Sequence, residues 1–241
     1  MTNGADELIT LISETFLEQG DEILVPSPSF SEYDFGAHLM GASIVPVPFT
    51  DQFEYHVAAL LSAVTERTKI LYLCSPNNPT GTYLSRTQLK ELLDSLRKDI
   101  LVVFDGAYSH YATAEDYTDG FEFIDSGYPV IVLQTFSKIY GLAGIRVGFG
   151  AASEFIINNI LKVKEPFNVN MLAQAAAAMT DYQHVQQSQE LNENGHRFLY
   201  NAFSDLGLKY IKSMSNFVFV KIGSNAKEIY EMLMKKGVIT R

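Results

Sequence analysis

Short apolar runs alternate with longer amphipathic stretches along the first two thirds of the chain. Apolar runs bounded by turn residues are typical of buried strands, and apolar residues at every third or fourth position are typical of helices. The pattern predicts strands over Ile23–Val25, Ser43–Val47, Lys69–Cys74, Leu101–Asp105 and Val130–Thr135. It predicts helices over Asp6–Glu18, Phe30–Met40, Tyr55–Val64 and Ser85–Lys98.

Strands and helices that alternate in this way predict the α/β fold class. Right-handed crossovers then produce a mainly parallel sheet with helices on both faces, and ligands bind beyond the carboxyl ends of its strands. Candidate site residues are therefore expected directly after strands.

The pattern changes at Ser153 and becomes mostly helical. An alanine-rich stretch around Leu172–Met179 precedes a predicted strand over Asn216–Val220 and a predicted helix over Ala226–Lys235. We therefore expect a large domain over residues 1–165, and a linker helix with part of a smaller α+β domain over residues 166–241.

Composition narrows the classes of protein. The 241 residues are 47% hydrophobic and 19% charged, which is typical of a globular protein with a large core. The net charge of −10 without a basic run disfavours nucleic acid as a partner. No apolar stretch approaches the roughly 20 residues that span a bilayer, and no signal peptide opens the chain, so we expect a cytoplasmic protein without membrane contact. The single Cys74 is expected to be a buried thiol, and the five histidines lack metal-ligand spacing, so no metal site is predicted.

Three strand ends carry candidate chemistry. The first is the turn Ser75-Pro76-Asn77-Asn78-Pro79-Thr80-Gly81, which alone is compatible with an ordinary turn. The second is Asp105-Gly106-Ala107-Tyr108, where a lone Asp is more often a helix cap. The third is Thr135-Phe136-Ser137-Lys138, with Gly141-Leu142-Ala143-Gly144-Ile145-Arg146-Val147-Gly148 shortly after it. Most lysines are solvated surface charges, but one beside an apolar strand end can act as an amine nucleophile.

In this order the three segments resemble the class I/II, fold type I aminotransferases, and most closely the histidinol-phosphate aminotransferase branch. The resemblance covers nearly the whole chain. It implies an aspartate-aminotransferase-like large domain and the cofactor pyridoxal 5′-phosphate (PLP). It also implies catalytic roles for Lys138, Asp105 and Tyr108.

The resemblance assigns each residue around the cofactor ring a role. Lys138 would bind the cofactor aldehyde covalently and then move the substrate proton. Asp105 would pair with the pyridine nitrogen and keep it protonated. Tyr108 and Asn78 would donate hydrogen bonds to the phenolic oxygen, and Phe30 would lie over the ring face.

The resemblance also assigns the phosphate and, more loosely, the substrate. Arg146, Thr135 and Ser137 would bind the phosphate together with the backbone of Ala5 and Asp6 at a helix N-terminus, although Asp6 could instead only cap its helix. In the stretch Pro166-Phe167-Asn168-Val169-Asn170, Asn168 would reach the substrate.

The chain departs from the family at its ends and at one motif position. Gly106 stands where close relatives often carry Glu, and we expect a mild effect because this position does not contact the cofactor. Family members also have an N-terminal segment with an edge strand and a C-terminal arginine for the substrate carboxylate. The chain therefore looks truncated at both ends, and we expect an exposed sheet edge and poor solubility.

The resemblance implies an amino donor and a 2-oxo acid as substrates and a homodimer as the assembly. The expected activity is transamination between histidinol phosphate, or an aromatic amino acid, and 2-oxoglutarate. Two alternatives stay open at this point. One is a related PLP-dependent decarboxylase of a phosphorylated amino acid, and the other is an inactive PLP-binding fragment.

Overall fold

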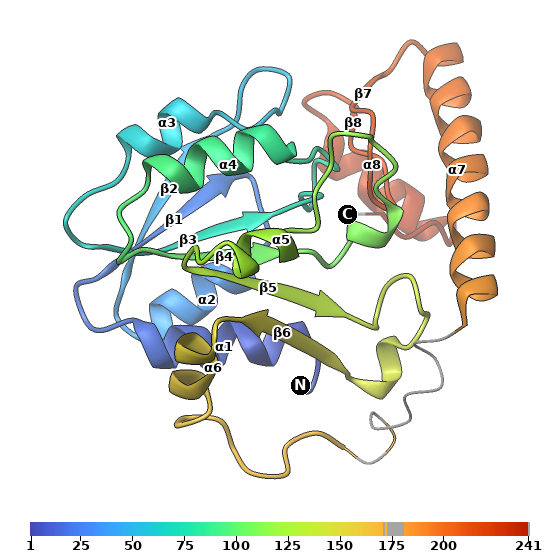
Figure 1. Ribbon diagram of the computed structural model, residues 1–241. Helices are drawn as coiled ribbons and strands as arrows, with labels where there is room; N and C mark the ends of the chain where they lie inside the picture. The colour runs from blue at the N-terminus through green and yellow to red at the C-terminus, as the bar shows by residue number, and fades with distance from the viewer. Residues whose placement is uncertain (171, 173–180, 241) are drawn as a thin grey trace.

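The large sheet has six strands in the order β2-β1-β3-β4-β5-β6 (Figure 1). The computed structural model describes residues 1–170, 172 and 181–240. The strands are β1 Glu22–Ser27, β2 Ser43–Pro48, β3 Thr68–Cys74, β4 Leu101–Asp105, β5 Val130–Thr135 and β6 Gly148–Ala152. Strands β1 to β5 are parallel and β6 pairs with β5 in the antiparallel sense. The predicted α/β class and the five predicted strands are confirmed.

Helices cover both faces of this sheet (Figure 1). One face carries α1 Ala5–Phe16, α2 Glu32–Leu39 and α6 Glu154–Ile160. The other carries α3 Val57–Ser62, α4 Arg86–Ser95 and α5 Phe121–Asp125. Side chains along a strand point alternately to the two faces, so in β4 Leu101 and Val103 pack with α1, while Val102 and Phe104 pack with α4.

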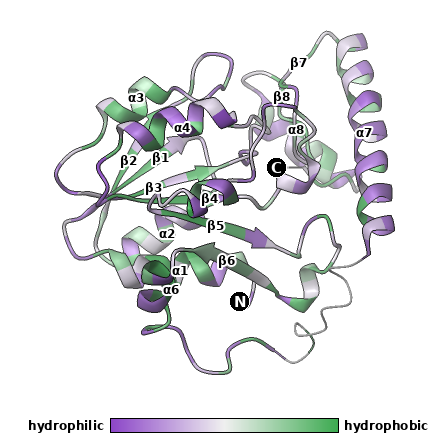
Figure 2. Cartoon of the chain, in the orientation of Figure 1, coloured by the Kyte–Doolittle hydropathy of each residue, from purple (hydrophilic) through white to green (hydrophobic). Residues whose placement is uncertain are grey.

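Burial on both faces explains why the strands appear in the sequence as continuous apolar runs. Every residue of β4 and β5 is buried, and the central strands are mostly hydrophobic in Figure 2. In Figure 1 the arrowhead of β5 points toward the long helix α7 Tyr182–Asp205. The carboxyl ends of the parallel strands therefore face the C-terminal part of the chain.

Strand β6 was not predicted, because its sequence is Gly-Phe-Gly-Ala-Ala and small residues have low strand propensity. Its small residues have a packing reason. A Cβ placed on Gly150 would overlap Leu8 of α1, and one placed on Gly148 would lie 2.8 Å from the backbone nitrogen of Ala5. Helix α1 therefore lies directly against β6. The short helix α5 was also not predicted, since its five residues are too few to show a helical period.

The C-terminal part contains α7, a two-stranded antiparallel pair and α8. The pair is formed by β7 Lys209–Tyr210 and β8 Val220–Lys221, and α8 spans Ala226–Lys235 as predicted. The predicted strand over Asn216–Val220 is wrong in its range, because Phe217 leaves the ladder and packs edge-on against Tyr108, with 5.2 Å between ring centroids.

Two expectations about this part stay open. The alanine-rich stretch around Leu172–Met179 lies outside the described residues, apart from Leu172. The boundary between residues 165 and 166 stays a prediction. Within the ranges that the structure describes, no helix combines the length and the apolar character needed to cross a bilayer.

Candidate active site

A cavity of about 190 Å³ lies beyond the carboxyl ends of β3, β4 and β5, beside the N-terminus of α1. Its wall contains every residue that the sequence assigned to the cofactor: Ala5, Asp6, Phe30, Asn78, Asp105, Tyr108, Thr135, Ser137, Lys138 and Arg146. Three larger hollows, of about 500, 530 and 410 Å³, share only Thr135 and Lys138 with this set. The structure thus brings the candidate residues together, while their roles toward a cofactor stay predictions.

Asp105 is a buried carboxylate at the floor of this cavity, with only 3% of its surface exposed. Its Oδ2 accepts a hydrogen bond of 2.8 Å from the Tyr33 hydroxyl, and its Oδ1 accepts one of 3.0 Å from the Ala107 amide. Burial raises the pKa of Asp105, and these two hydrogen bonds oppose the shift. None of the ion pairs found among the described residues involves Asp105. The carboxylate therefore fits a cationic group in the cavity, such as a protonated ring nitrogen.

Tyr33 is a functional candidate that the sequence analysis missed. Its ring is fully buried, stacks on Tyr72 with 4.4 Å between centroids, and meets Phe30 edge-on at 5.7 Å. The available signal was its position three residues after Phe30, which places both rings on one side of the segment that enters α2. The side chain holds Asp105 from beneath the cavity.

The two adjacent asparagines after β3 have different roles, because one is buried in the turn and the other lines the cavity. Asn77 is fully buried: its Oδ1 accepts from Ser29 Oγ at 2.8 Å, and its Nδ2 donates to Pro28 O at 3.0 Å and Thr80 Oγ1 at 2.9 Å. Asn78 faces the cavity instead. Asn77 therefore fixes the turn, and Asn78 is available to a ligand.

Lys138 and Tyr108 face each other across the cavity. Lys138 Nζ lies 5.3 Å from the centroid of the Tyr108 ring, and Asn78 Nδ2 donates to the Tyr108 hydroxyl at 3.4 Å. The Lys138 carbonyl accepts from the Gly141 amide at 3.0 Å, which closes the turn after the lysine. Cys74 completes the wall, but burial raises the pKa of its thiol, so it stays protonated. The amine of Lys138 is therefore the candidate nucleophile of this cavity.

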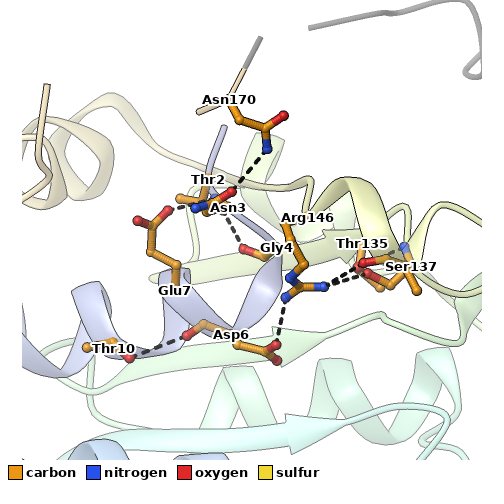
Figure 3. Close-up of polar contacts among 11 residues, drawn as sticks. Thr2, Asn3, Gly4, Asp6, Glu7, Thr10, Thr135, Ser137, Arg146 and Asn170 are labelled. Atoms are coloured by element: carbon orange, nitrogen blue, oxygen red, sulfur yellow. Dashed lines mark hydrogen bonds and ion pairs between the residues drawn. The ribbon is translucent and has the colours of Figure 1, made fainter. Parts of the chain in front are cut away.

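Cationic and hydroxyl donors gather at the other end of the cavity (Figure 3). Arg146 adopts the left-handed conformation, with φ of 56°, and follows the 3₁₀ turn Ala143–Ile145. A non-glycine residue in this region is strained, and such strain is typical of functional sites. The Arg146 guanidinium donates to Ser137 Oγ at 3.2 Å and to Asp6 Oδ2 at 3.0 Å, and Thr135 Oγ1 accepts from the Ser137 amide at 3.1 Å.

Helix α1 begins at this corner without a side-chain cap. Its N-cap residue is Gly4, and Asp6 lies inside the first turn, so Asp6 does not cap the helix. Gly4 has φ of 93°, and a Cβ added there would overlap Arg146 Nη2. Only glycine therefore lets the guanidinium lie this close to the start of α1.

Asn168, which the sequence assigned to the substrate, is not among the residues that line the cavity. Its Nδ2 donates to Glu7 Oε2 at 2.7 Å, and its buried Oδ1 has no hydrogen-bond partner. Glu7 also accepts from the Asn3 amide at 2.6 Å. The predicted contact of Asn168 with a substrate thus stays a prediction.

Helix α7 is hydrogen-bonded to the two chain segments that follow Lys138 and Tyr108. His184 Nε2 lies 3.2 Å from the carbonyl oxygen of Ile139, next to Lys138. Gln189 Nε2 donates to the carbonyl oxygen of His110, in the segment after Tyr108, at 2.6 Å.

The comparison with known proteins agrees with this geometry. The family model for class I and II aminotransferases matches residues 1–241. The chain belongs to this aminotransferase family. Membership of this family implies PLP as the cofactor, and the roles of Lys138, Asp105 and Arg146 toward it stay predictions.

Two relatives in the family are histidinol-phosphate aminotransferases. The enzyme of Moorella thermoacetica is 47% identical over 242 residues, which cover 99% of this chain and 62% of the relative. The enzyme of Bacillus pumilus is 42% identical over 242 residues, which cover 99% of this chain and 66% of the relative. The chain thus spans slightly less than two thirds of the length of these relatives.

Solved structures of the family share the fold. A putative histidinol-phosphate aminotransferase from Erwinia carotovora atroseptica has a TM-score of 0.94 at 26% identity, over 99% of this chain and 70% of that one. The enzyme of Sinorhizobium meliloti, solved in complex with pyridoxal-5′-phosphate, has a TM-score of 0.91 at 27% identity, over 100% of this chain and 67% of that one. The predicted aspartate-aminotransferase-like fold is confirmed.

Proposed function

We propose that this chain forms the PLP site of an aminotransferase that moves an amino group between histidinol phosphate, or an aromatic amino acid, and 2-oxoglutarate. The names of its relatives support this substrate class, and one solved neighbour contains the cofactor. We also propose that the active form is a cytoplasmic homodimer.

The buried carboxylate of Asp105 carries the proposal. A charge at this depth is unfavourable unless a cation faces it, and the described residues offer it no ion pair. Asp105 shares its cavity with Lys138 and Arg146, so a carboxylate, an amine and a guanidinium line one small cavity, as an aromatic phosphate with an aldehyde would require. When bound, PLP supplies a cationic ring that withdraws electrons from the substrate α-carbon.

The residues around Asp105 would orient the ring. Phe30 and Ala107 give the cavity apolar walls, and the Tyr108 hydroxyl and Asn78 amide lie together at one side as hydrogen-bond donors. Tyr33 keeps the Asp105 carboxylate fixed. Together these residues would hold a planar ring in one orientation. A fixed orientation is required for proton transfer between the substrate and a positioned side chain.

Lys138 would move the proton. Its Nζ would take the proton from the substrate α-carbon as general base and pass it to C4′ of the cofactor as general acid, and the opposite half-reaction would run this transfer in reverse. The Tyr108 ring at 5.3 Å would steady the ammonium form by a cation–π contact. Arg146, Ser137 and Thr135 would bind the phosphate together with the first turn of α1.

The test is the visible absorbance of the purified chain after incubation with PLP. A new band is expected in the parent and must be absent in Lys138→Ala. Because PLP also reacts with surface amines, Lys227→Ala on the exposed face of α8 is the matched control and should keep the band. Absence of the band in the parent would overturn the proposal.

The substrate assignment needs a second measurement. The holoprotein is mixed in turn with histidinol phosphate, an aromatic amino acid and a phosphorylated threonine, each with 2-oxoglutarate. Glutamate formation with the first or second donor supports the proposed activity, and release of carbon dioxide would indicate the decarboxylase. Sedimentation equilibrium of the same sample tests the homodimer.

A further inference from the structure

We propose that the Asp6 carboxylate occupies the anion position of the cofactor phosphate in the cofactor-free chain, so that the phosphate binds by displacing Asp6 from Arg146. This inference rests on the proposed function, because it takes the corner around Arg146 as the phosphate site. The backbone amide of Asp6 is proposed to bind the phosphate, whereas its side chain would compete with the phosphate for Arg146.

The geometry places the two groups in competition. Arg146 Nη2 donates to Asp6 Oδ2 at 3.0 Å, while Nη1 donates to Ser137 Oγ and to Ala143 O, both at 3.2 Å (Figure 3). Both Asp6 and Arg146 line the cavity. A phosphate that accepts from Ser137 and from the guanidinium in this corner therefore competes with the Asp6 carboxylate for Arg146.

The ion pair between Asp6 and Arg146 is weak enough to be broken by a ligand. The Asp6 side chain is 56% exposed and the Arg146 side chain 42% exposed, so water screens the pair and its contribution to folding is small. A phosphate carries more charge and accepts in more directions than one carboxylate, so it is the stronger partner for a guanidinium. Replacement of Asp6 by the cofactor phosphate is therefore favourable, although it breaks the hydrogen bond between Arg146 and Asp6.

A purely structural role for Asp6 does not explain its position. The next acid in the same turn, Glu7, performs the structural work: it accepts from the Asn3 amide at 2.6 Å and from Asn168 Nδ2 at 2.7 Å. Asp6 lines the cavity, and its carboxylate points toward Arg146 and accepts from its guanidinium. Glu7 therefore provides a control with the same charge in the same turn of α1.

Displacement has a measurable consequence. After the exchange, the Asp6 carboxylate remains close to a phosphate of the same sign, which opposes binding. Removing its charge without changing its shape should therefore tighten the binding of any phosphate-bearing ligand. A ligand that lacks the phosphate should not distinguish the two proteins.

The experiment titrates the cofactor-free 241-residue chain with PLP and with pyridoxal, which lacks the phosphate, in the parent, Asp6→Asn and Glu7→Gln. Visible absorbance gives the dissociation constants. For Asp6→Asn we expect PLP to bind about fivefold more tightly, equal to about 1 kcal/mol, and pyridoxal to bind as in the parent. For Glu7→Gln we expect a change of less than about twofold, since it does not contact Arg146.

A second readout needs no covalent chemistry. Inorganic phosphate should raise the melting temperature of Asp6→Asn more than that of the parent, because binding to the folded state stabilises it. Unchanged or weaker PLP binding in Asp6→Asn, or an equal gain with pyridoxal, would overturn the inference. If the parent itself does not bind PLP through Lys138, the proposed function fails first and this inference fails with it.

Discussion

The Tyr33 hydroxyl donates a hydrogen bond of 2.8 Å to Asp105 Oδ2 within the core, although the two residues lie 72 positions apart in the chain. Helix α2 thereby holds the carboxylate at the end of β4. A hydrogen bond to a buried charge is among the stronger polar contacts in proteins. Burial raises the pKa of Asp105, and the hydrogen bond from Tyr33 opposes this shift and favours the ionised carboxylate.

Tyr33→Phe should weaken PLP binding about 10-fold, because a hydrogen bond to a charged group contributes about 1.5–3 kcal/mol. Its loss raises the pKa of Asp105 further and leaves less carboxylate to face the cofactor. Visible titration with PLP measures the effect. The control is Tyr72→Phe, whose hydroxyl lies 3.4 Å from Ser13 Oγ and not at Asp105. Equal affinities for the two variants would contradict this role of Tyr33.

The stability of the cofactor-free chain should depend on pH through Asp105. Burial raises the pKa of its carboxyl, so the folded chain binds this proton more tightly than the unfolded chain. The resulting stabilisation is complete below the ordinary value of about 3.9 and is lost as pH rises through the raised value. The free energy of unfolding in urea, parent minus Asp105→Asn, should therefore fall with rising pH from about pH 4. A difference that is flat or rises with pH would rule out this assignment.

The two asparagines after β3 should separate stability from ligand binding. Asn77→Ala removes three buried hydrogen-bonding contacts and should lower the free energy of unfolding by about 2–4 kcal/mol. Asn78→Ala should change it by less than about 1 kcal/mol, yet it should shift the absorbance of bound PLP. Urea unfolding and visible spectra of both variants provide the test. The opposite pattern would mean that Asn77 faces the ligand.

Gly106 should tolerate a side chain only if Gln134 changes as well. A Cβ at this position would lie 2.6 Å from Gln134 Nε2 and 3.2 Å from Ser109 Oγ. Gln134 is buried and donates to Ser109 Oγ at 2.9 Å. Gly106→Glu should therefore destabilise the chain by about 1–3 kcal/mol. Adding Gln134→Ala should recover part of this loss, and additive effects in the double-mutant cycle would refute the coupling.

The sequence predicted the parts of the fold that repeat and the parts of the site that lie in single segments. Strands buried on both faces appear as apolar runs, and residues such as Asp105 and Lys138 follow strands that end at one edge of the sheet. β6 escaped prediction because contact with α1 requires small residues there, and small residues carry no strand signal.

Contacts between segments that are distant in the chain could not be predicted from the local sequence pattern. Nothing in the local pattern indicates that the Tyr33 hydroxyl meets Asp105, since that pair forms only when α2 packs on the sheet. Likewise, Asn77 and Asn78 are adjacent amides in one turn, and only the tertiary hydrogen bonds of Asn77 tell them apart. The expected mild effect of Gly106 stays a prediction, and its close approach to Gln134 is likewise a tertiary contact that the local sequence does not indicate.

Helix α7 connects the cavity to the rest of the C-terminal part. His184 bonds the carbonyl next to Lys138, and Gln189 bonds the carbonyl of His110, so both anchor points lie on one rigid rod. A small tilt of the rod would pull on the two walls together and alter the approach of the Lys138 amine to the Tyr108 ring. A force applied at the far end of the helix would therefore reach the chain segments beside Lys138 and Tyr108 through these two hydrogen bonds.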